Sequence, residues 1–329
     1  MEIEGSKIFI TGVGGFIGGR IARRAFERGA AVAGLEISEA AAGRAREIGV
    51  DVSIGDVNDP QAKLATAMRG ADAVIHTAAI VREGGRLEDF RHVNVKGTCN
   101  VAAAARDAGV PRFVHLSSIM VHGFDFPPDV PEDGPRRGEG SPYCITKIEG
   151  EDALREMHDP DGLGVIIIRP GDVYGAGSMP WVERPRELMR QKLMLVPKTA
   201  RVLNLVHVEN LVDGVFLALE ADAIGETFTI TDGETVGVID YFNRLADVCG
   251  EKRPRVMPEW VMRAAIAVQS AVLRIQGKEP EATPDAINFV KRPHAYSIDK
   301  ARRRLGYKPR IRLDEGFAEI AKDIAARSD

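Results

Sequence analysis

Tyr143 and Lys147 stand four residues apart, a spacing that sets both side chains on one face of a helix. Hydride transfer to or from a carbinol carbon requires a matched proton transfer at the oxygen of that carbon. A tyrosine with its ordinary pKa of ~10 is a poor base at neutral pH, and a neighbouring ammonium favours the tyrosinate and lowers that pKa. The pair therefore predicts acid–base chemistry at a hydroxyl or carbonyl group, with Lys147 also reaching the ribose of a cofactor.

Ser118 lies just past the expected strand Phe113–Ser117, at the carboxyl edge where parallel sheets bind ligands. Its hydroxyl is expected to hydrogen-bond the substrate oxygen beside Tyr143, and Ser117 is expected to be structural. A plain turn role for both serines is the alternative. Asn94 stands within an expected helix whose regularity its side chain can interrupt. A proton relay or a backbone-holding role suits it, and an ordinary exposed asparagine is the alternative.

The first turn of the chain reads TGVGGFIG, directly after an expected strand and directly before an expected helix. Gly12 permits a tight turn, Gly15 lets the backbone approach a pyrophosphate, and Gly18 lets the helix pack on the strand. The helix start at Phe16 and Ile17 supplies free N–H groups and a partial positive charge for the phosphates. This context predicts a dinucleotide-binding site.

Small or acidic residues end the next three expected strands. Glu36 is placed to accept hydrogen bonds from the adenosine ribose and to repel a 2′-phosphate, which predicts NAD(H) rather than NADP(H). A solvated strand-end acid is the alternative. Asp56, followed by Val57, is expected to accept from the adenine amino group, although capping of the next helix competes. Ala78 and Ala79 are small enough to let the backbone approach the cofactor.

These residues need a scaffold, and the first half of the chain alternates β-branched runs with amphipathic stretches, as βαβ units do. The expected strands are Lys7–Thr11, Ala31–Leu35, Val50–Ile54, Ala73–Thr77, Phe113–Ser117, Val165–Arg169, Val202–Val206 and Thr227–Thr231. The expected helices are Phe16–Arg28, Pro60–Met68, Leu87–Ala108, Tyr143–Met157, Arg186–Gln191, Glu209–Ala221 and Trp260–Ile275. We predict an α/β fold: a doubly wound parallel-sheet Rossmann domain over 1–175, with a return of the chain near 202–232, and a smaller, mainly helical substrate-binding region over 176–329.

The net charge and the cysteines limit which binding partners and which cellular location we expect. The formal net charge of -4 gives no global basic field for nucleic acid or anionic membranes. The three cysteines, Cys99, Cys144 and Cys249, show no CxxC and no metal spacing, so we expect no metal and a reducing, cytoplasmic location. No apolar stretch reaches the ~20 residues of a membrane span. We expect the helix Trp260–Ile275 to cover the active site, and a position on a membrane surface is the alternative.

Together these residues resemble the extended short-chain dehydrogenases/reductases, the NAD-dependent epimerase/dehydratase superfamily, over nearly the whole chain. The matching positions are Thr11–Gly18, Asp56, Asn94, Ser118, Tyr143, Lys147, Arg169–Gly175, His207–Asn210, Tyr296–Ala301 and Leu305–Pro309. The resemblance implies that Tyr143 is the general acid/base, that Ser118 orients the substrate oxygen, and that Lys147 tunes the tyrosine and binds ribose. It places Pro170 and Val173 among the contacts of NAD. It also implies a homodimer through helices 87–108 and 143–157.

Two positions bear on the substrate. Asp172 stands where nucleotide-sugar enzymes of the family usually carry Asn, and a carboxylate would repel a substrate diphosphate. Leu203 stands where many of them have Arg. The segment Gly277–Pro284, before the closing signature, resembles the 3β-hydroxysteroid dehydrogenase and dihydroflavonol reductase branch instead. The helix Trp260–Ile275 offers an apolar lining, and ordinary packing is equally consistent with its side chains: Trp260, Met262, Ile266, Val268 and Val272.

We therefore predict an NAD(H)-dependent oxidoreductase that interconverts a secondary alcohol and a ketone. Its small-molecule substrate is expected to be hydrophobic or uncharged, steroid-like or an aryl or alicyclic alcohol. The alternative is a nucleotide-sugar epimerase or dehydratase with tightly bound NAD. A non-catalytic NAD-sensing or scaffold protein is a further alternative, which the intact Ser118, Tyr143 and Lys147 disfavour.

Overall fold

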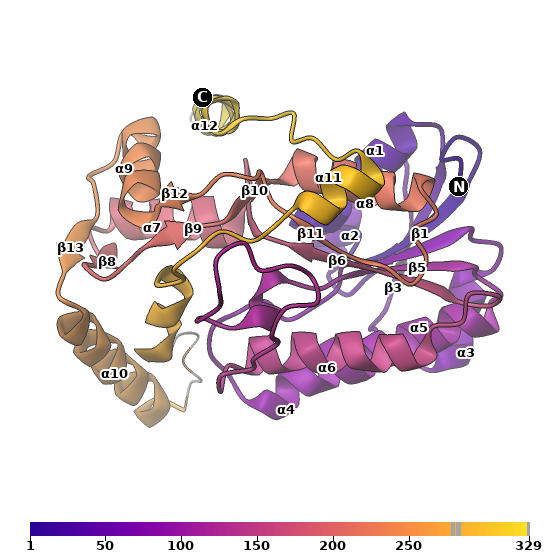
Figure 1. The fold of residues 1–329 in the computed structure, drawn as a ribbon, viewed down its shortest axis with the longest axis horizontal. Helices are drawn as coiled ribbons and strands as arrows, with labels where there is room; N and C mark the ends of the chain where they lie inside the picture. Colours follow the sequence, from indigo (N-terminus) through magenta and orange to yellow (C-terminus); the bar gives the residue numbers. More distant parts are fainter. Residues whose placement is uncertain (278–279, 281–283, 328–329) are drawn as a thin grey trace.

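A computed structural model describes residues 1–277, 280 and 284–327. Its centre is a parallel sheet of seven strands in the order β11-β6-β5-β4-β1-β2-β3 (Figure 1). The strands are β1 (Lys7–Thr11), β2 (Ala31–Glu36), β3 (Asp51–Ile54), β4 (Ala73–His76), β5 (Arg112–Leu116), β6 (Gly164–Pro170) and β11 (Thr227–Ile230). The predicted doubly wound parallel sheet is confirmed.

The helices cover both faces of this sheet. The longer ones are α1 (Phe16–Glu27), α2 (Glu39–Arg46), α3 (Gln61–Met68), α5 (Thr98–Asp107), α6 (Pro142–Met157), α8 (Val208–Glu220), α9 (Val238–Cys249), α10 (Glu259–Ile275) and α12 (Leu313–Ala326). The shorter ones are α4 (Leu87–Phe90), η1 (Arg91–Gly97), η2 (Ile119–His122), η3 (Met179–Glu183), α7 (Arg184–Arg190), η4 (Pro284–Val290) and α11 (Asp299–Leu305). The sequence did not single out α2, whose N-cap is Ser38.

Alternate residues of β1 separate two hydrophobic cores. Ile8 and Ile10 pack with residues of α1 and α8, and Phe9 packs on the other face with residues of α3, α5 and α6. Parallel central strands are buried on both faces, which explains their near-continuous apolar runs. The carboxyl ends of these strands are thereby held rigidly at one edge of the sheet, where the predicted site residues lie.

Two predicted elements are interrupted in the structure. The helix expected over Leu87–Ala108 is α4, the π-helical η1 and α5, and Asn94 lies within η1. The strand expected over Val202–Val206 divides into β9 (Val202–Leu203) and β10 (Leu205–His207). Neither joins the main sheet, because β9 pairs antiparallel with β12 (Val236–Gly237) and β10 pairs with β7 (Asp172–Tyr174). Within residues 176–277, 280 and 284–327, β11 is the strand that returns the chain to the main sheet.

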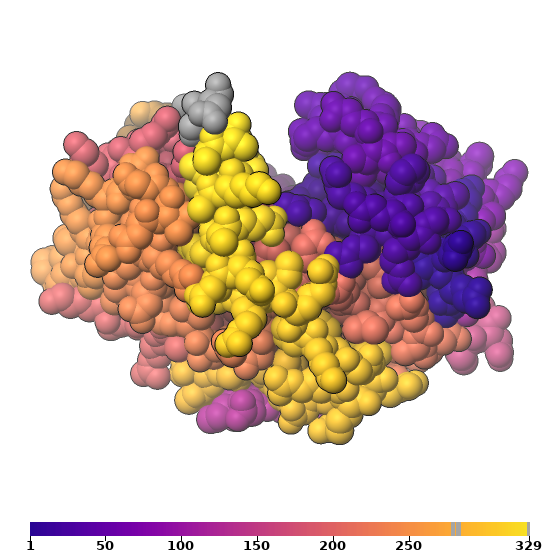
Figure 2. All heavy atoms as spheres, turned by 90° about the horizontal axis from the view of Figure 1, so that it is seen from above, coloured from indigo at the N-terminus to yellow at the C-terminus, as the bar shows by residue number. Residues whose placement is uncertain are grey.

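A third hydrophobic core lies outside the main sheet, with side chains from β8 (Leu195–Pro197), α7, α9 and α12. The helix α10 lies at an outer corner of the molecule, beyond β13 (Arg255–Met257) (Figure 1). Figure 2 shows the surface hollowed between the N-terminal part and the C-terminal segments. Within the described residues no helix has both the length and the hydropathy to cross a bilayer. The domain division at residue 175 stays a prediction.

Candidate active site

A cavity of about 630 Å³ lies at the carboxyl edge of the sheet and collects all of the predicted site residues except Asn94. The lining residues predicted from the sequence are Gly12, Gly15, Phe16, Ile17, Gly18, Glu36, Asp56, Val57, Ala78, Ala79, Ser118, Tyr143, Lys147, Pro170 and Val173. They come from positions up to 161 residues apart in the chain, between Gly12 and Val173. The parallel sheet is what brings them to one place.

The glycine turn has the backbone that a dinucleotide requires. Gly12 has φ +69, and a Cβ there would lie 3.0 Å from Thr77 Oγ1. A Cβ on Gly18 would lie 2.2 Å from the carbonyl oxygen of Gly12, so the helix can pack this closely only with glycine. Gly15 is the N-cap of α1 and offers no side-chain cap, which leaves the first-turn N–H groups for a phosphate. These residues fit the pyrophosphate of NAD.

Glu36 is buried, and three backbone N–H groups fix its carboxylate. Gly14 donates to Oε2 at 3.0 Å, and Ile37 and Ser38 donate to Oε1 at 3.0 and 3.2 Å. A carboxylate held this rigidly at the cavity wall can accept from ribose hydroxyls and opposes a 2′-phosphate. Gly14 also has a packing role that the sequence did not suggest, because a Cβ there would lie 2.2 Å from the carbonyl oxygen of Ala41 in α2.

Glu36→Gln is expected to reduce the preference for NAD over NADP about tenfold, which corresponds to ~1.4 kcal/mol. The amide keeps an acceptor for the ribose, while the charge that repels a 2′-phosphate is lost. Isothermal titration with both cofactors measures the ratio. The matched control is Glu39→Gln, an exposed carboxylate of α2 that does not line the cavity. Tighter binding of NADP than NAD by the wild-type protein would contradict the assignment of Glu36.

Of the predicted cofactor contacts Asp56 and Asn94, only Asp56 lines the cavity. Asp56 lines the cavity and accepts from the backbone N–H of Asn58 at 2.7 Å, and it does not cap α3, whose N-cap is Pro60. Asn94 is buried behind the cavity wall. Its amide oxygen accepts from the N–H of Ile80 at 2.8 Å, and its amide nitrogen donates to the carbonyl of Ile80 at 3.1 Å. Asn94 therefore holds the backbone of a lining segment and does not itself face the cofactor site.

The helix α6 carries the acid–base residues. Ser141 caps its first turn by accepting from the N–H of Cys144 at 3.4 Å, and Pro142 occupies the first helical position. Lys147 is buried, and its Nζ donates to the carbonyl of Leu116 at 2.8 Å, where β5 ends. Ser118 caps η2 by accepting from Met120 N–H at 3.2 Å, so it has a turn role and also lines the cavity.

The pKa of Tyr143 departs from the prediction. Burial raises it to about 12, and a hydrogen bond with Ser118 lowers it by less than burial raises it. Burial also lowers the pKa of Lys147 to about 8, and the charge of Glu151 opposes that change. The Lys147 ammonium lies 5.8 Å from the centroid of the Tyr143 ring and is hydrogen-bonded elsewhere. The expected lowering of the tyrosine pKa is therefore wrong for the protein alone, because burial raises that pKa and the opposing contribution comes from Ser118 and not from Lys147.

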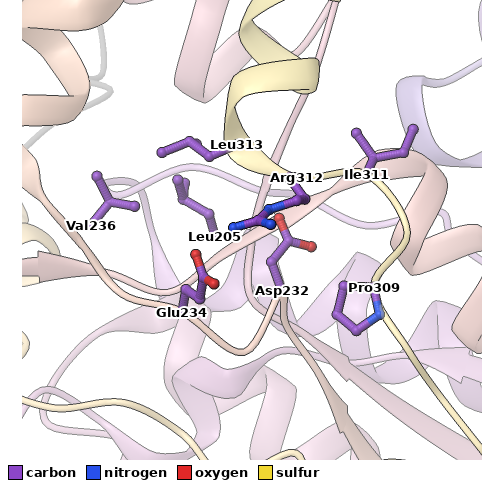
Figure 3. A pocket seen from close by; sticks show the side chains of 8 residues that line it. All are labelled: Leu205, Asp232, Glu234, Val236, Pro309, Ile311, Arg312 and Leu313. Atoms are coloured by element: carbon purple, nitrogen blue, oxygen red, sulfur yellow. The ribbon is translucent and has the colours of Figure 1, made fainter.

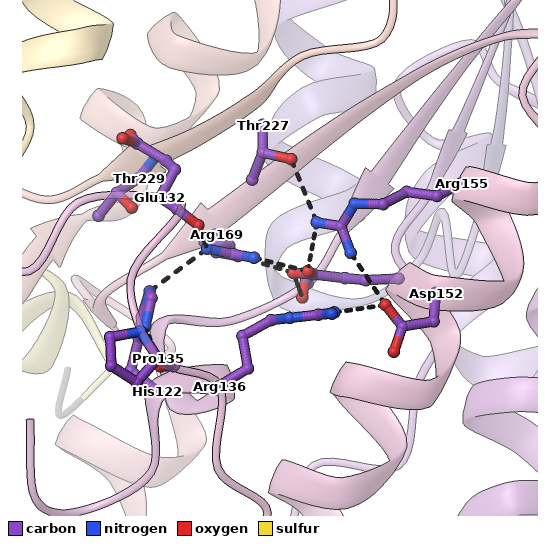
Figure 4. A network of polar contacts seen from close by, with 11 residues as sticks. His122, Glu132, Pro135, Arg136, Asp152, Arg155, Arg169, Thr227 and Thr229 are labelled. Carbon is purple, nitrogen blue, oxygen red and sulfur yellow. Dashed lines mark hydrogen bonds and ion pairs between the residues drawn. The ribbon is translucent and has the colours of Figure 1, made fainter.

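A buried ion pair that the sequence did not indicate joins α6 to β6 (Figure 4). Glu151, one turn after Lys147, accepts from Arg169 Nε at 2.8 Å and Nη2 at 2.7 Å. It also accepts from Ser117 Oγ at 2.6 Å, which gives Ser117 the structural role that was expected. Burial alone would raise the pKa of Glu151, but the hydrogen bonds and charge of Arg169 outweigh it and lower that pKa. This pair fixes α6 against β6 and so positions Lys147.

Glu151→Gln is expected to lower the free energy of unfolding by about 3–5 kcal/mol, because it leaves the buried Arg169 guanidinium without its counter-charge. Urea denaturation followed by circular dichroism measures the loss. The matched control on the same helix is Glu149→Gln, whose ion pair with Arg91 is partly exposed and should be worth no more than about 1 kcal/mol. Equal losses in the two variants would show that the buried ion pair contributes no more to the free energy of unfolding than the partly exposed one.

One part of the cavity wall, which we call the substrate end, is formed mainly by side chains that the sequence did not identify. Most are apolar and come from short segments without a motif: Ile80, Val81, Met120, Pro180, Trp181 and Phe289. Asp172 also lines this end, and Arg292 donates to its two carboxylate oxygens at 2.8 and 2.7 Å. The two residues are 120 positions apart, so no local pattern could reveal the pair. The negative charge of Asp172 is thus compensated, which weakens the argument that it repels a diphosphate.

The predicted position of the helix Trp260–Ile275 is wrong, although the helix exists as α10. None of its apolar side chains named above lines the cavity. Trp260 is 73% exposed and Val268 65% exposed. The helix packs mainly on η4 and β8, which places it one layer away from the substrate end. Leu203, in β9, is fully buried and does not line the cavity either.

A second cavity, of about 320 Å³, lies between β10 and the start of α12 (Figure 3). Asp232 faces it and accepts from the backbone N–H of His207 and from the amide of Asn210. Burial raises the pKa of Asp232 to about 6. None of the predicted site residues lines this cavity, so the acid–base chemistry belongs to the larger one.

Comparison with known proteins agrees with this geometry. Residues 8–231 match the family described as the NAD dependent epimerase/dehydratase family. The chain is 32% identical to the 2-alkyl-3-oxoalkanoate reductase of Stenotrophomonas maltophilia, over 97% of this chain and 100% of the relative. It is 28% identical to the 3-beta-hydroxysteroid dehydrogenase of Mycolicibacterium neoaurum, over 95% of this chain and 90% of the relative.

A solved structure shows the same fold. The UDP-glucuronic acid 4-epimerase of Bacillus cereus, in complex with UDP-glucuronic acid and NAD, has a TM-score of 0.77 at 21% identity and covers 98% of this chain and 99% of its own. The chain belongs to the NAD-dependent epimerase/dehydratase family. It is accordingly an NAD-dependent enzyme that acts on CH–OH groups.

Proposed function

We propose that the protein interconverts a secondary alcohol and a ketone with NAD(H), on a hydrophobic substrate such as a steroid-like or an aryl or alicyclic alcohol. The observation that carries the proposal is the single cavity in which the glycine turn, Tyr143 and Lys147 meet an apolar substrate end with Met120 and Trp181 in its wall. Apolar pockets with a few convergent polar groups are typical of small-molecule sites.

The polar groups have separate roles in this reaction. When bound, NAD supplies the hydride acceptor, or its reduced form the donor. Tyr143 gives its hydroxyl proton to the carbonyl oxygen during reduction and takes the proton back during oxidation. Ser118 hydrogen-bonds the same oxygen and orients it. Because the pKa of Tyr143 is about 12, the residue carries its proton at neutral pH and is ready to act as the acid of ketone reduction.

The relatives support a hydrophobic ketone or alcohol, since one is named as a reductase of 2-alkyl-3-oxoalkanoates and another as a 3-beta-hydroxysteroid dehydrogenase. A second candidate is a nucleotide-sugar epimerase that retains NAD. It is favoured by Arg82 and Arg184, two cations that line the cavity where a diphosphate could bind, and by the pairing of Asp172 with Arg292.

The test is net NADH formation or consumption, followed by absorbance, across a panel of sterols, aryl alcohols, branched 3-oxoalkanoates, simple sugars and nucleotide sugars. The proposal expects turnover with hydrophobic alcohols or ketones. Activity confined to nucleotide sugars, without net cofactor turnover, would establish the second candidate instead.

The proposal includes a homodimer through helices 87–108 and 143–157, in a reducing cytoplasm. The free thiols of Cys99, Cys144 and Cys249 suit that location. Analytical ultracentrifugation tests the assembly, and a monomer at micromolar concentration would contradict it.

A further inference from the structure

The helix α10 carries an apolar face that nothing in the described structure covers. Only two of its side chains are buried, Met262 and Ser270. Five of the eleven large apolar side chains exposed on the described surface belong to α10 or to the neighbouring β8–β13 pair: Val256, Trp260, Val268, Val272 and Ile275. Soluble monomers rarely gather exposed apolar side chains in this way, and such patches mark interaction surfaces.

The segment of the chain that carries this face differs in the sign of its net charge from the chain as a whole. Residues 251–277 contain five Lys/Arg and only two Asp/Glu, whereas the whole chain has a formal net charge of -4. No acidic residue occurs between Trp260 and Gly277. The side chains of Lys252, Arg255 and Arg274 are exposed. An apolar helical face with exposed cations beside it, at an outer corner of the molecule (Figure 1), is complementary to an anionic lipid surface.

The same helix is hydrogen-bonded to η4, a segment that lines the substrate end of the cavity. Arg263 donates from Nη1 to the carbonyl of Pro284 at 3.0 Å and from Nη2 to the amide oxygen of Asn288 at 3.2 Å. Both acceptors lie in η4, whose Phe289 lines the cavity. Among the described residues, a surface that holds α10 is therefore separated from the substrate end of the cavity by η4 alone.

We propose that α10 docks the protein onto the headgroup region of an anionic bilayer, with Trp260, Val268, Val272 and Ile275 entering the interface and the adjacent cations contacting lipid phosphates. At 17 residues, about 25 Å long, the helix lies along the surface and does not span it. Docking goes beyond the reaction proposed above and does not depend on which alcohol or ketone is the substrate.

The test is co-sedimentation of the full chain with phosphatidylcholine vesicles, with and without about one third phosphatidylglycerol. The proposal expects binding at least tenfold tighter to the anionic vesicles, weakened by salt. Val268→Asp combined with Val272→Asp should abolish binding, and Lys252→Glu with Arg255→Glu should remove the preference for anionic lipid. Phe26→Ser, which removes an exposed aromatic ring from α1, is the matched control and should bind as the wild type does.

These substitutions lie on the surface and outside the cavity, so NAD affinity and turnover of a water-soluble alcohol should stay unchanged. Those two readouts show that the variants are folded, and they separate a failure of docking from a failure of the proposed reaction. If the wild-type protein co-sediments with neither type of vesicle, the proposal is overturned. If Val268→Asp with Val272→Asp instead dissociates an oligomer in ultracentrifugation, α10 is an interface between copies of the chain, which also overturns it.

Discussion

Tyr143→Phe is expected to lower kcat by about three orders of magnitude while NAD binds nearly as tightly as to the wild type. The substitution removes only the hydroxyl that exchanges a proton with the substrate oxygen, and positioned general acids contribute 10²–10⁴-fold. The aromatic ring, its packing and the position of Lys147 are kept. Steady-state kinetics and titration with NAD measure the two effects separately. Retained turnover would remove Tyr143 from the mechanism.

The pH dependence of the wild type gives a second readout of the same residue. Since the pKa of Tyr143 is raised to about 12, its basic form is scarce at neutral pH and increases tenfold per pH unit. Alcohol oxidation should therefore accelerate from pH 6 toward pH 8, and Tyr143→Phe should lose this dependence.

The matched control is Tyr307→Phe, the same chemical change outside the cavity. Tyr307 is buried and its hydroxyl donates to the carbonyl of Thr231 at 3.1 Å. Loss of that hydrogen bond should cost about 1 kcal/mol of stability. It should leave kcat unchanged. An equal loss of activity in both variants would point to a general structural effect of removing a buried hydroxyl.

The strands of the sheet and the catalytic residues could be predicted because their signals are local. Alternation of buried runs with amphipathic stretches locates β1 and α1 within a residue. The glycine turn and the spacing of Tyr143 and Lys147 are short patterns whose chemistry needs those residue types. Order along a parallel sheet then requires that Ser118 lie at the same edge, which the structure shows.

The substrate end could not be predicted, because its residues meet only through the tertiary fold. Arg292 reaches Asp172 across 120 positions, and Phe289 and Trp181 lie in short helices with no distinguishing pattern. The apolar residues of α10 looked like a cavity lining from their spacing. Spacing identifies an apolar face but does not say what the face contacts, and here it faces outward. The pKa of Tyr143 was misjudged for a similar reason, since the sequence shows the neighbouring charge but not the extent of desolvation.

Lys147→Met is expected to lower turnover about 100-fold or more and to weaken NAD binding, yet to leave the protein at least as stable as the wild type at pH 7. The activity falls because the ammonium that reaches the ribose and the region of Tyr143 is lost. The stability is kept because a buried charge is removed. Burial lowers the pKa of Lys147 from 10.5 to about 8, which shows that the folded protein disfavours its ammonium form.

The sign of the pH effect follows from proton binding. Between pH 8 and about 10.5 the unfolded chain keeps the lysine proton that the folded protein has released, so the free energy of unfolding contributed by this group rises with pH. Below pH 8 the cost of the buried ammonium is present in full. The neighbouring His76 and His115 do not add to this pH dependence, because burial lowers the pKa of both side chains and keeps them neutral over this pH range.

Lys147→Met should therefore show its greatest stability relative to the wild type at pH 7, and this advantage should shrink as the pH rises toward 10.5. The loss of the hydrogen bond to Leu116, about 1 kcal/mol, offsets part of the gain. Urea denaturation at pH 7 and pH 10 measures both values, with Lys96→Met, at an exposed lysine, as the control. A variant that is clearly less stable than the wild type at pH 7 would mean that Lys147 is held mainly by favourable contacts. In that case those contacts would outweigh the cost of burying the ammonium group, and the burial of Lys147 would serve structure as well as catalysis.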